Sequence, residues 1–216
     1  MELLKKLCET DGISGREDAV VELLQKELKD HADQIKVDAM KNIIAKKEGT
    51  ADNRKRVMLA GHIDEIGFLI YNVSEKGFAS ISPVGGWMAG SIAGHTVKVY
   101  TRKGEVLTGV VCTKAKMTPE AAKKAPELSD LFIDFGMDGE TVKEKVQRGD
   151  WVAMDTPFQE LGDCFVAKAF DDRVGAYIIA EAFKKYDNPN IDVYCVGTSQ
   201  EEVGLRGATV AAQSVK

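Results

Sequence analysis

The chain has 216 residues, of which 44% are hydrophobic and 29% are charged, and this is the composition of an ordinary globular protein. Its net charge of -5 argues against a nucleic-acid partner, and no apolar run reaches the roughly 18 residues that a membrane helix requires. The first residues lack the apolar core of a signal peptide, so we expect a cytoplasmic protein without a membrane partner. The four cysteines lie far apart and are predicted to be free thiols.

The N-terminal part of the sequence predicts helices followed by strands. The segment Ser14-Gly15-Arg16-Glu17 has the pattern of a capping box, and apolar residues at helical spacing after it predict a helix over about 16–31. Three short strands are then expected, at residues 35–37, 43–45 and 56–60. The last of these strands is predicted to be buried, and it would place His62 at its carboxyl end.

From about residue 67 the sequence changes to short β-strands separated by turns. Glu75-Lys76-Gly77 and Arg102-Lys103-Gly104 are typical hairpin turns. A short helical stretch is expected to open at Thr118. The predicted strands are residues 68–73, 78–84, 96–100, 106–112, 131–133 and 151–154. Short strands at this spacing are typical of a small β-barrel.

The helix and strand pattern returns after about residue 164. Asp171-Asp172 begins a predicted helix that ends before Asn188-Pro189. A buried strand is expected at residues 191–197, and a last helix at 205–215. The predicted fold class is therefore α/β, with one α/β domain interrupted by a β-barrel insert. The predicted boundaries are 1–66 plus 165–216 for the α/β domain and 67–164 for the insert.

Three short acidic clusters follow predicted buried segments, and they contain the candidate functional residues. The clusters are Gly61-His62-Ile63-Asp64-Glu65, Phe170-Asp171-Asp172-Arg173 and Gln200-Glu201-Glu202-Val203-Gly204. Open α/β sheets bind ligands outside the carboxyl ends of their strands. Because carboxylates and an imidazole gathered there are what a two-metal hydrolytic site needs, we predict such a site.

Each cluster alone also has an ordinary structural interpretation. A histidine after a strand is more often structural than a ligand, acids in a first helical turn complement the helix dipole, and paired acids often lie on a surface. The functional interpretation makes His62 a metal ligand whose second ring proton is accepted by Asp64. It makes Asp171 a bridge between two cations. It divides Glu201 and Glu202 between a metal ligand and a base that takes a proton from the attacking water.

Taken in order along the chain, four segments resemble the motifs of one family. Their sequences are GHIDEIGF at 61–68, PVGGW at 83–87, FDDRVG at 170–175 and QEEVGLRGA at 200–208. They look like the tetrahedral, or glutamyl-type, dinuclear metalloaminopeptidases, a family also labelled FrvX-like or endoglucanase. The resemblance runs the whole length of the chain, and four ordered motifs make it specific.

The resemblance implies a zinc-peptidase-like α/β sandwich domain with an inserted β-barrel that serves assembly into a homo-oligomer, commonly a dodecamer. It implies that His62 binds one zinc or cobalt ion, that Asp171 bridges two ions and that Glu202 binds the second. Glu201 would be the general base that activates the water between the ions, and Asp64 would orient His62. The substrate would be the free N-terminal residue of a peptide.

The sequence departs from the family pattern in one respect. Family members are considerably longer and supply two further ligands, an Asp and a His, after the position of Lys216, so the chain resembles a C-terminally truncated member. Two protein ligands per ion predict weak or absent metal. One alternative is therefore a non-catalytic peptidase-like fragment that mediates assembly or binding. A second is a glycosidase, which the adjacency of Glu201 and Glu202 disfavours because its two carboxyls must flank one bond.

Overall fold

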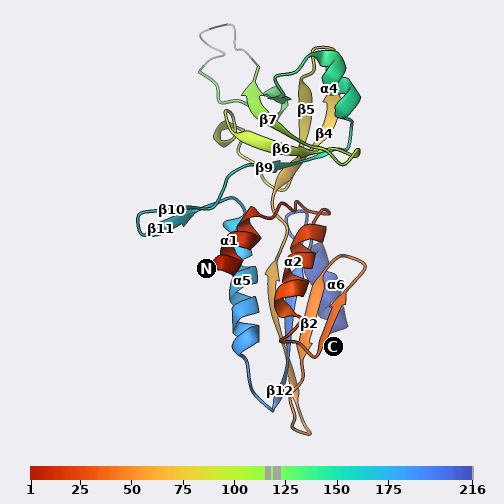
Figure 1. The fold of residues 1–216 in the computed structure, drawn as a ribbon, viewed down its shortest axis with the longest axis vertical. Helices are drawn as coiled ribbons and strands as arrows, with labels where there is room; N and C mark the ends of the chain where they lie inside the picture. The colour runs from red at the N-terminus through yellow and green to blue at the C-terminus, as the bar shows by residue number, and fades with distance from the viewer. Residues whose placement is uncertain (115–117, 119–122, 216) are drawn as a thin grey trace. The chain divides into compact units, whose positions relative to one another are not determined.

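The computed structural model describes residues 1–114, 118 and 123–215 (Figure 1). The chain divides into two compact units, Met1–Glu65 together with Pro157–Lys216, and Ile66–Thr156. The helical stretch predicted to continue from Thr118 falls on residues outside this description.

The first unit contains a four-stranded mixed sheet in the order β1-β2-β12-β3. Strand β2 pairs antiparallel with β1 on one side and with β12 on the other. Strand β12 runs parallel to β3, and this pairing places Thr198 opposite His62. Parallel neighbours end at the same edge of a sheet, so the segments that follow β3 and β12 start side by side. The strands are β1 (Gln34–Val37), β2 (Ile43–Lys47), β3 (Lys55–His62) and β12 (Ile191–Thr198).

Helices pack on both faces of this sheet. On one face, apolar residues of α1, α2 and α5 form the main core, in which Leu24 and Phe183 pack with Cys195. On the other face, Ala211 of α6 packs with Val196. Because side chains alternate along a strand, the neighbours Cys195 and Val196 contribute to opposite faces. The helices are α1 (Glu2–Glu9), α2 (Asp18–Leu28), α5 (Phe170–Lys185) and α6 (Arg206–Ser214).

The second unit is a closed antiparallel barrel with the strand order β4-β5-β8-β7-β6-β9. Alternate residues such as Val97 and Val99 fill its interior together with Phe68 and Ile133. The predicted fold class, an α/β domain interrupted by a small β-barrel, is confirmed. The strands are β4 (Gly67–Val73), β5 (Ala79–Val84), β6 (Thr96–Tyr100), β7 (Val106–Thr113), β8 (Leu131–Asp134) and β9 (Trp151–Met154), and the short helices of the unit are η1 (Ala89–Ser91), η2 (Leu128–Asp130) and α4 (Gly139–Lys145).

The barrel interior is expected to be sensitive to the loss of a single methylene. Ile133 is fully buried, so Ile133→Val should lower the free energy of unfolding by about 1 kcal/mol through the small cavity it leaves. Tryptophan fluorescence during urea unfolding is the measurement, because Trp87 and Trp151 both lie in this unit. The control is Val106→Ala, since Val106 is 53% exposed and its truncation should change the value far less. Equal losses in the two variants would contradict the packing shown for Ile133.

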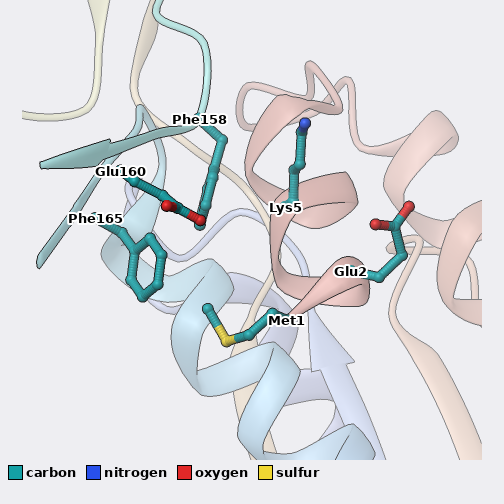
Figure 2. A pocket seen from close by; sticks show the side chains of 6 residues that line it. All are labelled: Met1, Glu2, Lys5, Phe158, Glu160 and Phe165. Atoms are coloured by element: carbon teal, nitrogen blue, oxygen red, sulfur yellow. The ribbon is translucent and has the colours of Figure 1, made fainter. Parts of the chain in front are cut away.

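A separate hairpin of β10 (Gln159–Leu161) and β11 (Cys164–Val166) belongs to the first unit. The predicted insert boundary of 67–164 extends past the compact barrel unit, which ends at Thr156. Beside the hairpin lies a hollow of about 280 Å³ (Figure 2), lined by Met1, Glu2, Lys5, Phe158, Glu160 and Phe165.

The four cysteines are free, as predicted. Among the described residues, no helix combines the length and the apolar character needed to cross a membrane.

Candidate metal centre

Three segments of the first unit bring the predicted site residues together. The end of β3 carries His62, the segment after β12 carries Glu201 and Glu202, and the start of α5 carries Asp171. Close approach of α5 to β3 depends on Gly61, where an added Cβ would lie only 3.0 Å from the backbone of Gly175 and of Ala176. A residue without a side chain at this position therefore lets the helix start lie against the strand end.

The candidate ligand atoms form a compact group. One ligand atom from each of His62, Asp171 and Glu202 lies within 4.8 Å of the other two. The Nε2 atom of His62 is 2.9 Å from Oδ1 of Asp171 and 3.7 Å from Oε2 of Glu201. The side chain of His62 is 9% exposed, whereas that of Asp171 is 88% exposed. The group is therefore buried at His62 and accessible to solvent at Asp171.

Asp64 lies behind this group and is completely buried. Its carboxylate accepts the hydroxyl of Ser14 at 2.5 Å and the backbone N–H groups of Glu201 at 2.9 Å and Glu202 at 3.1 Å. The Nδ1 atom of His62 is 3.1 Å from the backbone oxygen of Asp64 and 3.5 Å from its Oδ1. One carboxylate thus contacts two of the three segments that carry site residues, the end of β3 and the segment after β12. Burial alone would raise the pKa of Asp64, but hydrogen bonds from His62, Ser14 and the two amides outweigh it and lower the pKa.

The electrostatics of the group favour a positive charge at its centre. Burial alone would lower the pKa of His62, but its interactions with Asp64 and Asp171 outweigh this effect and raise the pKa to about 9. The pKa of Glu202 is raised by burial and by its acidic neighbours, although His62 acts in the opposite direction. Carboxylates that hold a proton on an imidazole in this way would also attract a metal cation to the same place. One imidazole and two carboxylates are a donor set that zinc accepts, so the residues fit a divalent metal.

The second aspartate of the α5 pair has a different role from the first. Asp171 and Asp172 are joined by a cis peptide bond, and Oδ1 of Asp172 accepts the backbone N–H of Gly175 at 3.0 Å. Asp172 therefore stabilises the first turn of the helix, which the backbone of Ala169 enters in a left-handed conformation (φ 59°). Asp171 is left free to project from the turn toward His62.

A buried ion cluster lies next to the candidate ligands in the sequence and was not predicted from it. The Nζ atom of Lys168 lies 2.6 Å from both Asp11 Oδ1 and Glu65 Oε1, and Arg173 Nη2 is 3.8 Å from the same Glu65 atom. Arg173 also donates to the backbone oxygens of Leu7 and Thr10. A signal was present, since Glu65 and Arg173 each lie within three residues of a predicted ligand. The charged pairs are long-range, so their partners could not be read from spacing.

The capping box predicted at Ser14-Gly15-Arg16-Glu17 is wrong. Helix α2 begins at Asp18, and its N-cap residue Glu17 makes no side-chain capping bond. Ser14 instead donates to Asp64, and Glu17 accepts the backbone N–H of Gln200 at 3.1 Å. Both side chains are thus used by the segments of the candidate site rather than by the helix that follows them.

A sequence profile for the family described as M42 glutamyl aminopeptidase matches residues 41–216, a range that contains all of the candidate ligands. The chain belongs to this family. The resemblance found in the four ordered motifs is therefore confirmed.

Individual members of the M42 family align along nearly all of this chain. The putative aminopeptidase FrvX of Escherichia coli (strain K12) is 34% identical over 221 residues, which cover 100% of this chain and 61% of FrvX. The aminopeptidase APDkam598 of Desulfurococcus kamchatkensis has 38% identity and a TM-score of 0.90, over 98% of this chain and 58% of that one. The TET1 peptidase of Pyrococcus horikoshii has 34% identity and a TM-score of 0.86, over 99% and 65%. The chain thus spans roughly three-fifths of the length of these relatives.

Proposed function

We propose that this chain carries ligands and the general base of a metal-dependent aminopeptidase centre. His62 would hold one divalent cation, zinc or cobalt, Glu202 would hold a second, and Asp171 would bridge the two in a complete site. The observation that supports this best is the convergence of one imidazole and two carboxylates within 4.8 Å in a member of an aminopeptidase family. Each cation would then have two protein ligands from this chain, whereas a catalytic zinc ion normally takes three.

The proposed reaction is the release of the N-terminal residue of a peptide by water. When bound, divalent cations polarise the scissile carbonyl and lower the pKa of water. Glu201 is the residue proposed to take a proton from the attacking water and to pass it to the leaving amine. Its carboxylate is half-buried beside His62, which keeps it within reach of the ligand group without being part of it.

Asp64 is proposed to hold the centre together rather than to react. Its carboxylate contacts His62 and accepts the backbone N–H groups of Glu201 and Glu202. It would therefore fix the direction in which the side chains of His62, Glu201 and Glu202 leave the backbone. Partners that tune a metal ligand in this way affect metal affinity strongly.

Assembly and location follow by analogy with the relatives. The TET1 peptidase is described as assembling into a tetrahedron or an octahedral shell. We propose that this protein is a homo-oligomer, a dodecamer in the form that the family resemblance implies, with the barrel unit serving assembly. Its substrates would be peptides with a free N-terminus in the cytoplasm.

Hydrolysis of leucine and glutamate p-nitroanilides with added zinc or cobalt tests the proposal. Glu201→Gln should lower kcat by about 100-fold, because it removes the base without removing a ligand. Zinc affinity measured by calorimetry should change little in Glu201→Gln and should fall by about 100-fold in His62→Gln.

The matched control is Glu22→Gln, since Glu22 is an exposed glutamate on α2 of the same unit. Its activity and zinc affinity should equal those of the unmodified chain. Hydrolysis that persists in a chelator would contradict a metal-dependent mechanism, whereas chelator-resistant cleavage of a glycoside would favour the glycosidase class. Zinc binding without hydrolysis would favour a non-catalytic binding role for the chain.

A further inference from the structure

Glu17 is a buried carboxylate whose position the start of α2 does not explain. Its side chain is 0% exposed although glutamate is rarely buried without a charged partner. Its Oε1 atom accepts two backbone N–H groups, from Gly15 at 2.8 Å and from Gln200 at 3.1 Å. Its Oε2 atom has no hydrogen-bond partner within the described part of the chain. Burying a carboxylate is unfavourable unless its hydrogen bonds compensate for the lost hydration. The two backbone N–H groups that it accepts are therefore the groups that it stabilises.

Both residues that donate to Glu17 have left-handed backbones. The φ angle is 82° at Gly15 and 52° at Gln200. Glycine adopts this conformation readily, but a residue with a Cβ atom, such as Gln200, does so only when its surroundings favour it. The carboxylate of Glu17 is such a surrounding group, because it receives the N–H that the left-handed turn at Gln200 points inward. The two residues that follow this turn are Glu201 and Glu202.

The segment that contains Glu17 contacts the other strand end as well. Ile13 forms a parallel bridge with Glu65, and the Ser14 hydroxyl donates to Asp64. Asp64 in turn receives the amides of Glu201 and Glu202. Residues 13–17 are therefore connected to two of the three site segments, to the end of β3 through Asp64 and Glu65 and to the segment after β12 through Gln200.

We propose that Glu17 is a positioning residue of the metal centre. By fixing the backbone of Gln200, it sets the direction in which Glu201 and Glu202 leave the chain, and so it aligns the base and a ligand without touching either side chain. The inference rests on the proposed roles of Glu201 and Glu202 only for its effect on metal binding. The effect on the backbone of residues 200–202 is independent of those roles.

Amide hydrogen exchange of the metal-free chain tests the backbone part directly. Glu17→Met keeps the length of the side chain but removes the acceptor, and it should speed exchange at Gln200, Glu201 and Glu202 by about tenfold or more. Glu17→Gln keeps an oxygen acceptor and should stay within about threefold of the unmodified chain. If Glu17→Met does not fold, Glu17→Asp takes its place, because it withdraws the carboxylate by one methylene.

The matched control is Asp150→Ala in the barrel unit. Asp150 is 1% exposed and also accepts two backbone N–H groups, from Gln147 at 2.7 Å and from Arg102 at 3.0 Å. Its loss should leave exchange at residues 200–202 unchanged. Unchanged exchange there in Glu17→Met, or a rise no larger than in Asp150→Ala, would overturn the proposal.

Zinc calorimetry supplies the second readout and separates the two proposals. Glu17→Met should weaken zinc binding by about tenfold or more, and Glu17→Gln should restore most of the affinity. Local exchange that rises while zinc affinity stays equal to that of the unmodified chain would show that Glu17 orders the segment but does not position a ligand, and would overturn the positioning role. A chain that binds no zinc in any form would count against the proposed function, while the exchange result would still decide whether Glu17 fixes the backbone.

Discussion

Glu65→Gln is expected to lower the free energy of unfolding of the first unit by about 3–5 kcal/mol. The substitution keeps the shape of the side chain and an acceptor for the Gly12 amide, which donates to Glu65 at 2.9 Å. It removes the negative charge that faces Lys168 and Arg173, whose side chains are 5% and 0% exposed. Two buried cations would then share only Asp11 as an anionic partner in the cluster. A buried pair that loses one member leaves an uncompensated charge, and this is the source of the large effect.

The measurement uses the separate spectroscopic signals of the two units. Both tryptophans lie in the barrel, whereas α1, α2, α5 and α6 all lie in the first unit. In urea, Glu65→Gln should shift the unfolding transition seen by far-ultraviolet circular dichroism and leave the tryptophan fluorescence transition in place. The control is Glu75→Gln, because Glu75 is 89% exposed and its pair with Lys143 should contribute less than about 1 kcal/mol. Equal effects of the two substitutions would mean that the buried cluster does not stabilise the unit.

The metal-free chain is expected to lose about 2 kcal/mol of stability as the pH rises from about 6.5 to about 9. The pKa of His62 is near 6.5 in an unfolded chain and is raised to about 9 in the folded one. The folded state therefore binds the proton more tightly, so its advantage is complete below about pH 6.5 and disappears as the pH rises through about 9. Solvent screens the interaction of His62 with buried Asp64 little, but it screens the interaction with Asp171, which is 88% exposed, so the expected loss is smaller than the full pKa shift would give.

Urea unfolding in a chelating buffer, followed by circular dichroism at several pH values, checks this dependence. His62→Gln should be less stable near pH 6 and should show a nearly flat profile up to pH 9, because it cannot bind the proton. The control is His31→Gln, since His31 is exposed and its removal should leave the slope intact. A profile for His62→Gln as steep as that of the unmodified chain would contradict the charge environment described for His62.

The candidate residues were predictable from the sequence because each acidic cluster directly follows an apolar segment. The apolar run at 191–197 and the shorter one ending at Ala60 are visible as strands, and the direction of each fixes which end carries the acids. What brings His62 close to Glu202 is the parallel pairing that sets Thr198 opposite His62. That pairing joins segments more than a hundred residues apart, and no local pattern specifies it.

The capping box predicted at Ser14 and Glu17 was wrong because the two side chains bond to partners that are distant in the sequence. Local spacing correctly identified two side chains that form hydrogen bonds, but it assigned them the nearest partners in the sequence. In the fold, Asp64 and Gln200 are available instead, and their contacts with Ser14 and Glu17 connect three segments. Sequence spacing indicates which groups need a partner, whereas tertiary structure decides which partner they obtain.

The absence of a side chain at Gly61 has a consequence for the metal centre. His62 is attached to the strand one residue after Gly61, and Asp171 is attached to the first turn of the helix that lies against it. At this point the backbone of β3 lies against the backbone of α5 at Gly175 and Ala176, and the carboxylate of Asp172 lies beside the contact. The separation of the two backbone positions that carry these candidate ligands is thus set by contact between peptide units, and the side-chain rotamers of His62 and Asp171 adjust only the last few ångströms.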